Sequence, residues 1–267
     1  MPELPEVESI RKFLAPVLIG QKLIKFNISD KRISRLNQQK PILGSTLNSI
    51  NRKGKFLYFQ FSKFIVVIHL GMSGRITLNS KLGKHTHATL TFEMDKLNYE
   101  DIRKFGYIKI IEASELNNYL KKLGPDSLNL INQEKIQIVE HAKNRKVTIK
   151  NFLLNQNIIS GIGNIYCSEI LFLSKIHPNT KVVNLNNDEW EKIFTSIKKI
   201  LKSAVKNNGT TLDDLTYYLP YGEYGKNQNF LNIYQKEICN LCKSKIDKIY
   251  IDKRSSYFCG KCQKLKI

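Results

Sequence analysis

The sequence lacks any long apolar run. Near the middle of the chain, the longest uninterrupted aliphatic or aromatic stretch is Phe64 to Ile68, whereas a membrane-spanning helix needs about 20 apolar residues. Nothing resembling a secretory signal is present, which favours a reducing, cytoplasmic compartment over an oxidising one. We therefore expect a soluble cytoplasmic protein that does not enter a membrane.

Acidic residues are scarce relative to basic ones. The 267 residues include 43 Lys or Arg against 23 Asp or Glu, a formal net charge of +20. This excess is larger than solubility requires, and a polyanion that releases counterions on contact is its natural partner. The charge favours nucleic acid, although a lysine-rich composition without a specific partner would give the same count.

Cysteine is also scarce, with five in the chain, and four of the five stand close to its end. They follow the spacing C-x2-C-x16-C-x2-C, which is typical of a tetrahedral zinc site: Cys239, Cys242, Cys259 and Cys262. The surrounding segment is too small to bury much core, so a bound metal would take the place of that core. Two disulfides are the alternative, but reduced thiols are free to bind metal. We expect one structural Zn²⁺, because four thiolates leave no open position for water or substrate.

The apolar pattern divides the chain into three parts. Apolar residues recur at helical spacing before Gly20. Short β-rich runs then continue to about residue 112, including 56–61, 64–69, 88–94 and 107–111. After residue 126 the spacing becomes helical again, with helices expected near 132–143, 147–154, 163–174 and 187–206. We predict a multidomain α+β protein with an antiparallel β domain at 1–130, a helical domain at 131–228 and a four-cysteine zinc finger at 229–267.

The first residues offer an unusual nucleophile. Removal of Met1 would expose the secondary amine of Pro2. An α-amino group titrates near 8, so about a tenth of it is neutral at pH 7, far more than of a lysine. Glu3 could then transfer protons at the carbon that the amine attacks. On these residues alone, a proline and glutamates that only begin a helix remain the alternative.

Five motifs occur in an order that resembles one family. They are MPELPEVE at residues 1–8, HLGMSG at 69–74, RKFG at 103–106, GIGNIY at 161–166 and the four-cysteine tail. In this order and at these separations, the chain resembles the bacterial formamidopyrimidine-DNA glycosylases over nearly its whole length. The resemblance implies an N-terminal β-sandwich flanked by helices, a helix-two-turns-helix domain and a zinc finger.

The resemblance also implies a reaction on damaged double-stranded DNA. Pro2 would displace an oxidised purine from its deoxyribose as a Schiff base, and the strand would then be nicked by β- and δ-elimination. Glu3 matches the residue that transfers protons, and Glu6 matches a second acidic residue in the same pocket. Lys55 matches a lysine that contacts phosphate and assists catalysis. A metal takes no part in these steps.

Three further matches are intercalating residues. A base must leave the stack before its sugar can be reached, and the gap that it leaves has to be filled. Met72 and Phe105 match the family's apolar wedges, and Arg103 matches the residue that bonds the orphaned partner base. Without the resemblance, Met72 and Phe105 would be read as packing residues.

The remaining matches concern the DNA backbone. The resemblance implies that Asn164, His69 and Arg254 approach phosphates, Arg254 as the zinc-finger arginine that supports catalysis by gripping the strand beside the lesion. The loop that recognises the lesion should lie near residues 217–225. We expect the protein to act as a monomer.

Three positions depart from the usual family pattern: Asn155, where aspartate is common, Lys253, where glycine is common, and Ile102, where proline is common. None of them belongs to the expected catalytic set. Two other functions stay open. One is an endonuclease VIII-type glycosylase for oxidised pyrimidines, and the other is a zinc protein that binds DNA without catalysis.

Overall fold

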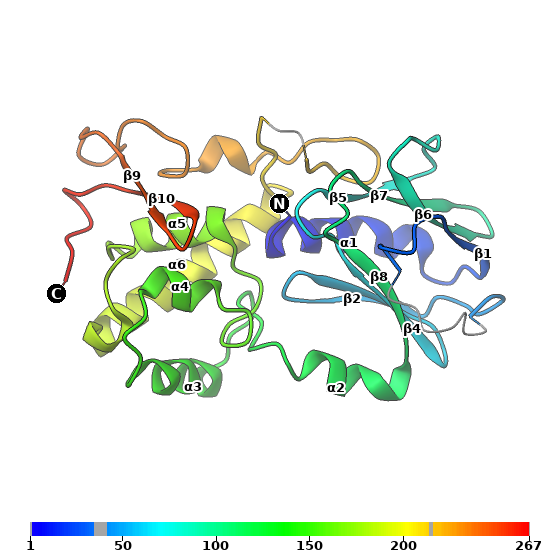
Figure 1. The fold of residues 1–267 in the computed structure, drawn as a ribbon, viewed down its shortest axis with the longest axis horizontal. Helices are drawn as coiled ribbons and strands as arrows, with labels where there is room; N and C mark the ends of the chain where they lie inside the picture. Colours follow the sequence, from blue (N-terminus) through cyan, green and yellow to red (C-terminus); the bar gives the residue numbers. More distant parts are fainter. Residues whose placement is uncertain (1, 35–41, 214–215, 267) are drawn as a thin grey trace. The chain divides into compact units, whose positions relative to one another are not determined.

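The computed structural model describes residues 2–34, 42–213 and 216–266 (Figure 1). Contacts within the chain define two compact units: unit 1 contains Met1–Lys122 and Val205–Gln228, and unit 2 contains Leu123–Ala204 and Asn229–Ile267. The cysteine-bearing segment thus groups with the helices, and residues 205–228 group with the β-rich part. The division into three domains at residues 130 and 228 stays a prediction.

Unit 1 is built on two four-stranded antiparallel sheets. The first has the strand order β1-β6-β7-β5, with β1 (Leu23–Ile28), β6 (Thr86–Phe92), β7 (Lys96–Asp101) and β5 (Gly74–Leu78). The second has the order β2-β3-β4-β8, with β2 (Ser49–Lys53), β3 (Phe56–Gln60), β4 (Phe64–His69) and β8 (Tyr107–Glu112). The β-rich runs predicted from the sequence correspond to β3, β4, β6 and β8.

A single core joins the two sheets. Along β3, Leu57 and Phe59 are buried while their neighbours are half-buried, the period-two pattern of a strand with one face inside. These residues share one apolar cluster with Leu90 of the first sheet and with Val7 and Leu14 of the first helix. The predicted β-sandwich with a flanking helix is therefore confirmed.

Helices cover the sandwich in two places. The first helix, α1 (Leu4–Leu18), was predicted from its apolar spacing, and its stripe of apolar residues is buried as expected. The chain then turns at Gly20, whose φ of +94° suits glycine. A short helix, α2 (Leu116–Leu120), packs with the outer face of β4, so that β4 is buried on both faces. The sequence pattern did not reveal α2, because five residues are too few for a helical period.

Unit 2 is mainly helical. Its helices are α3 (Asn132–Ala142), α4 (Ile149–Leu154), α5 (Asn164–Leu173) and α6 (Asn187–Lys206), whose last two residues belong to unit 1. All four ranges lie where helical spacing predicted them. Helix α5 is buried on nearly all sides, and α6 buries one stripe that includes Trp190, Ile193 and Leu201. No helix of residues 2–34, 42–213 and 216–266 has the length and apolar character needed to cross a bilayer.

A hairpin at the end of the chain completes unit 2. Strands β9 (Asp247–Ile251) and β10 (Arg254–Phe258) pair in antiparallel register, and β10 packs with α5. The buried carboxylate of Glu169 on α5 accepts backbone N–H bonds from Asn232, Ile233 and Tyr234 at 2.9 Å each. The Glu169 carboxylate therefore attaches the start of the cysteine-bearing segment to α5.

Candidate functional site

The candidate nucleophile lies at the buried start of α1. Pro2 is buried, and Glu3 and Glu6 are each 1 % exposed. Glu3 is the N-cap of the helix, and its backbone N–H donates to Glu6 Oε2 at 2.8 Å. The local sequence explains this geometry, because an acidic side chain three residues into a helix can bond back to the N-cap, and Pro5 suits the first turn.

Glu6 also holds a distant segment against the start of α1. Its Oε1 accepts a 2.7 Å hydrogen bond from the backbone N–H of Thr210. At the preceding residue, Gly209, an added Cβ would lie 2.9 Å from the same oxygen, and φ is +78°. Glycine is therefore required there both for space and for backbone conformation. Glu6 is thus a structural link between the two ends of unit 1.

Tyr217 reinforces this link. Its hydroxyl donates to the Asn208 carbonyl at 2.8 Å, and its carbonyl accepts from Thr211 Oγ1 at 2.9 Å. Burial, and then the negative charge of Glu6, raises the pKa of Tyr217 well above its ordinary value. The phenol therefore stays protonated and serves as a hydrogen-bond donor at neutral pH.

The segment predicted to read the lesion follows directly. Gly225 N–H donates to Thr211 Oγ1 at 2.9 Å, and the Pro220 carbonyl accepts from the Leu78 N–H at 2.9 Å. Leu219 and Glu223 close a turn between these anchors, while Tyr221 is 52 % exposed at its tip. Both ends of residues 217–225 are therefore held by hydrogen bonds within unit 1, the unit that also contains Glu6.

Lys55 follows a turn that is tied to α1. Glu8 on α1 accepts from Arg52 Nε at 3.0 Å and from Arg11 Nη2 at 2.7 Å. Arg52 Nη1 then donates to the Gly54 carbonyl at 2.9 Å. Burial alone would raise the pKa of Glu8, but the bond from Arg11 and the charge of Arg52 outweigh it and lower that pKa. The Glu8–Arg52 ion pair and the Arg52–Gly54 bond therefore tie the turn that precedes the half-buried Lys55 to α1.

His69 lies next to this turn at the end of β4. Phe56, which follows Lys55, is the cross-strand partner of His69, and the two ring centroids are 4.6 Å apart. The Gly71 N–H donates to His69 Nδ1 at 3.2 Å. That bond assigns the Nδ1 position as the acceptor and leaves Nε2 to carry the proton of a neutral imidazole. His69 thereby connects the Lys55 turn to the loop that contains Met72.

The three expected wedge residues stand on two touching loops. A Cβ at Gly71 would lie 2.5 Å from the Gly106 nitrogen and 2.6 Å from the Phe105 carbonyl carbon, so the two backbones are in close contact. Met72 is 40 % exposed and Phe105 is 55 % exposed. The guanidinium carbon of Arg103 lies 4.7 Å from the centre of the Phe105 ring. Large apolar side chains are thus presented to solvent together, which packing alone does not explain.

A buried carboxylate, Asp101, fixes both loops. Its side chain is fully buried and accepts from Ser73 Oγ at 2.6 Å, from Arg103 N–H at 3.1 Å and from Gly106 N–H at 2.9 Å. Ser73 Oγ in turn accepts from the Arg103 N–H at 3.1 Å. A carboxylate accepts several bonds at once. The Asp101 side chain therefore holds Ser73 on the first loop and both ends of residues 103–106 on the second.

Two residues expected to contact phosphate, Asn164 and Arg254, lie close together in unit 2. Asn164 is the first residue of α5, and its Nδ2 donates to Ser255 Oγ at 3.4 Å. Ser255 follows Arg254, which is exposed at the start of β10. The buried Lys150 donates to the Ser255 carbonyl at 2.5 Å and to Ser256 Oγ at 2.6 Å. An exposed arginine and a helix N-terminus are therefore neighbours, an arrangement suited to phosphate oxygens.

The turn between β9 and β10 contains Lys253, which stands where the family pattern usually has glycine. Asp252 and Lys253 connect β9 to β10 with φ values of +46° and +62°. A two-residue turn with both central residues at positive φ is the form that matches the twist of the strands, and it favours glycine. Lysine at Lys253 therefore adopts this conformation at an energetic cost and presents a further cation next to Arg254.

The four cysteines form a compact set of ligands. Their sulfurs all lie within 4.8 Å of one another, with Cys239 to Cys262 at 3.9 Å and Cys242 to Cys259 at 3.4 Å. A disulfide requires about 2.05 Å, whereas a tetrahedron with metal–sulfur bonds of about 2.3 Å separates its sulfurs by about 3.8 Å. The arrangement fits one metal ion and not two disulfides.

The acidities of these thiols point the same way. Burial, followed by hydrogen bonding among the neighbouring thiols, raises the pKa of Cys262 to about 12. Bonds with Ser244 instead lower the pKa of Cys242 to about 6. Four sulfurs this close, two of them in buried cysteines, cannot all be thiolates without a positive charge between them, which a divalent cation would supply.

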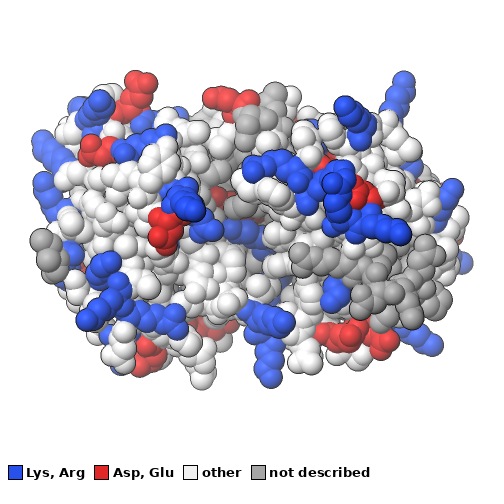
Figure 2. Space-filling model, in the orientation of Figure 1, with Lys and Arg blue, Asp and Glu red and all other residues white. Residues whose placement is uncertain are grey.

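Basic side chains extend over both units. On the face drawn in Figure 2, Lys and Arg side chains are more widely distributed than Asp and Glu side chains. This distribution agrees with the net charge of +20. None of these side chains is a site on that ground alone, because solvated lysines need no ligand.

Sequence reasoning named the residues that are expected to touch DNA but not those that hold them in position. Asp101, Glu8 with Arg52, and Tyr217 were not singled out. Asp101 stands two residues before Arg103 in the matched motif, and this proximity could have indicated it. Glu8 and Arg52 are 44 positions apart, and no local pattern pairs them.

Comparison with known proteins agrees with this description. Residues 1–108 match the formamidopyrimidine-DNA glycosylase N-terminal domain, and residues 123–216 match the formamidopyrimidine-DNA glycosylase H2TH domain. The formamidopyrimidine-DNA glycosylases of Aliivibrio fischeri strain MJ11 and Glaesserella parasuis are 38 % and 36 % identical. The first alignment covers 98 % of both chains and the second 99 % of both.

Solved structures agree as well. The Lactococcus lactis Fpg in complex with DNA containing an abasic site superposes with a TM-score of 0.90 at 34 % identity, covering 98 % of this chain and 100 % of that one. The same values hold for the wild-type L. lactis Fpg with DNA containing N7-benzyl-Fapy-dG. Two family domains, near-full-length relatives and a shared fold place the chain in the formamidopyrimidine-DNA glycosylase family.

Proposed function

We propose that this protein is a bifunctional DNA glycosylase and AP lyase that removes oxidised purines such as 8-oxoguanine and formamidopyrimidines from duplex DNA. The observation that carries the proposal is the position of Pro2 and Glu3, buried together at the start of α1. Once Met1 is removed, the chain would present a secondary amine and a carboxyl group side by side. Damaged DNA as the partner is supported by the L. lactis complexes, which contain such DNA.

The chemistry would proceed through a Schiff base. The neutral Pro2 amine attacks C1′ of the extruded nucleotide, and the bond to the damaged base breaks as the base takes up a proton. Ring opening of the sugar leaves an iminium between Pro2 and C1′, which makes the C2′ proton acidic. Loss of that proton expels the 3′ phosphate, and a second elimination expels the 5′ phosphate. Glu3 is placed to donate and accept these protons.

The two wedge loops would hold the opened duplex. Met72 and Phe105 are already exposed and would enter the stack without unfolding any core. Arg103 would bond the orphaned base opposite the lesion. Asp101 would keep Arg103 and Phe105 in position during insertion, since it bonds backbone groups on either side of them.

Phosphate contacts would come from both units. Lys55 and His69 are joined through Phe56 in unit 1, and Asn164 and Arg254 are joined through Ser255 in unit 2. Zn²⁺ is the metal we propose for the four cysteines, with a structural role only. Bound there, it would hold the hairpin that carries Arg254, while Pro2 and Glu3 act without it.

Borohydride trapping tests the proposal. The purified protein should become covalently linked to duplex containing 8-oxoguanine opposite cytosine when borohydride reduces the iminium. A variant with one residue added before Pro2 should not be trapped, because its proline nitrogen is an amide. A variant extended by one residue at the C-terminus is the matched control and should be trapped normally.

The outcomes separate the candidate functions. Trapping mainly on oxidised pyrimidines would favour an endonuclease VIII-type enzyme. Failure to trap on any lesion or abasic site would leave a DNA-binding protein without catalysis. Normal base excision by protein that mass spectrometry shows to retain Met1 would contradict the assignment of Pro2.

A further inference from the structure

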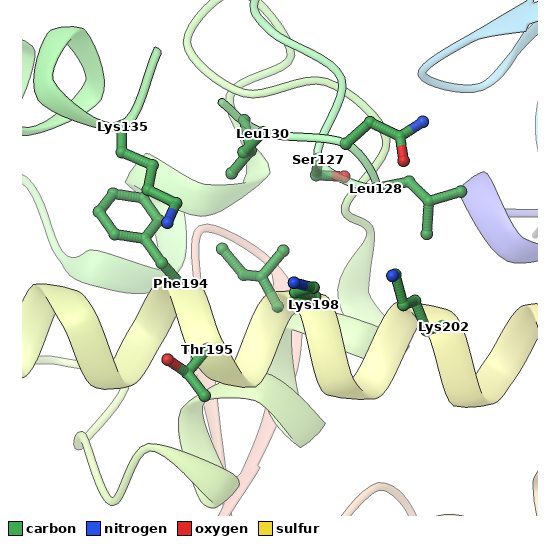
Figure 3. A pocket seen from close by; sticks show the side chains of 10 residues that line it. Ser127, Leu128, Leu130, Lys135, Phe194, Thr195, Lys198 and Lys202 are labelled. Carbon is green, nitrogen blue, oxygen red and sulfur yellow. The ribbon is translucent and has the colours of Figure 1, made fainter. Parts of the chain in front are cut away.

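A cavity in unit 2 stands apart from the residues assigned above. It has a volume of about 490 Å³, within the range of small-molecule pockets. Helix α6 forms one wall, and the segment Ser127–Leu130 forms the other. Figure 3 shows Lys198 and Lys202 on α6 directed toward that segment, and Lys135 of α3 lying beside the Phe194 ring.

The polar groups of this cavity favour an anion. Lys135, Lys198 and Lys202 all line it, and no carboxylate does. Lys198 and Lys202 are one helical turn apart, a spacing at which like charges repel. Within the part of the chain that the structure describes, neither has an acidic partner. A bound anion would relieve this repulsion.

A buried hydroxyl provides a second and independent indication. Ser127 is 2 % exposed, and its Oγ has no hydrogen-bond partner among the described residues. Buried polar atoms without a partner are rare and costly. A hydroxyl both donates and accepts, whereas lysines only donate. A ligand that accepts hydrogen bonds therefore suits both the lysines and this hydroxyl.

Apolar side chains complete the cavity. Leu128, Leu130, Ile197 and Phe194 line it together with the lysines. The Nζ of Lys135 lies 5.8 Å from the centre of the Phe194 ring, a cation–π contact that positions the ammonium at the wall. A ligand here would carry both a strongly charged group and an apolar or aromatic part.

We propose that this cavity binds a small organic phosphate of mononucleotide size. A phosphate monoester carries about −1.5 to −2 charges and three acceptor oxygens, which suits three lysines and one hydroxyl better than a carboxylate does. The apolar lining favours a free phosphate compound over a duplex backbone, because the buried Phe194 and Ile197 would contact the organic part of a small molecule. The proposal does not depend on the trapping chemistry of Pro2.

Calorimetric titration of the full chain with 2′-deoxyguanosine 5′-monophosphate tests the proposal. We expect saturable binding at one site, and no binding of 2′-deoxyguanosine, which lacks the phosphate. Lys198→Gln, Lys202→Gln and Ser127→Ala should each weaken binding by about tenfold, the effect of losing one hydrogen bond to a charged group. Lys199→Gln is the matched control, an exposed lysine of α6 that does not line the cavity, and should change the affinity by less than about twofold.

Thermal unfolding checks that the variants fold. Without ligand, Ser127→Ala should unfold at the same temperature as the wild type or higher, because the unpartnered hydroxyl is gone. Absence of saturable binding would overturn the proposal, as would equal losses in Lys198→Gln and Lys199→Gln or equal binding of the nucleoside. An equal loss of affinity for undamaged duplex in Lys198→Gln would also overturn it, since the lysines would then belong to a DNA surface.

Discussion

Replacing Asp101 by asparagine tests how the wedge loops are held. The carboxylate is fully buried and accepts four hydrogen bonds, from Ser73 Oγ, Arg103 N–H, Gly106 N–H and Tyr99 OH at 2.6 to 3.3 Å. Asparagine has nearly the same shape but only one acceptor oxygen. Its amide nitrogen would face either the Gly106 N–H or the Arg103 N–H, so that two donors would meet.

The magnitude follows from these bonds. A hydrogen bond to a charged group contributes about 1.5 to 3 kcal/mol, and a buried N–H left without a partner costs about 1 to 3 kcal/mol. Where the amide nitrogen replaces an oxygen, the backbone N–H loses its acceptor, while the hydroxyl there can turn to accept from the amide. The bonds at the other oxygen become bonds to a neutral group. We expect Asp101→Asn to lower the free energy of unfolding by about 3 to 5 kcal/mol.

Urea unfolding at 25 °C, followed by circular dichroism, measures this loss. Asp213→Asn makes the same chemical change at an exposed residue of unit 1 and should stay within about 0.5 kcal/mol of the wild type. Adding Ser73→Ala to Asp101→Asn should cost less than the sum of the two single losses, because Ser73 bonds both Asp101 and Arg103. An Asp101→Asn protein as stable as the Asp213→Asn control would refute the reasoning.

Three further predictions follow from the same structure. Glu8→Gln should lower the free energy of unfolding at pH 7 by about 3 to 5 kcal/mol, because Arg52 keeps a buried charge. Since folding lowers the pKa of Glu8, the stabilisation is complete above its unfolded pKa of about 4.3. The wild-type advantage should therefore shrink as the pH falls below that value, and unfolding curves from pH 7 to pH 3 would show it; a constant difference would contradict the ion pair. Lys253→Gly should raise stability by about 1 kcal/mol, because positive φ costs lysine and not glycine, and a lower unfolding midpoint would argue against this. Chelation of the proposed Zn²⁺ should weaken DNA binding in a gel-shift assay without preventing borohydride trapping at saturating protein, and loss of trapping at full occupancy would mean that the metal takes part in the chemistry.

Local sequence patterns predicted most of the secondary structure. Helices α1 and α3 to α6 lie where the spacing of apolar residues placed them, since that spacing reports which face of a helix is buried. Strands β3, β4, β6 and β8 were equally clear. The short helix α2 and the hairpin β9 to β10 were not, because α2 has no fully buried residue and β9 has one, so that no apolar period marks them.

The sequence by itself determined the family and the ligand spacing of the four cysteines, and it predicted the amine that Pro2 would present once Met1 is removed. Each of these features depends on which residue types stand at fixed positions along the chain. Only the tertiary structure decided what supports them. Glu6 meets Thr210 across 204 positions, and Lys150 meets Ser256 across 106. A buried charge needs a hydrogen-bond partner, and here that partner comes from a distant part of the chain. No periodic pattern in the sequence indicates such a pair.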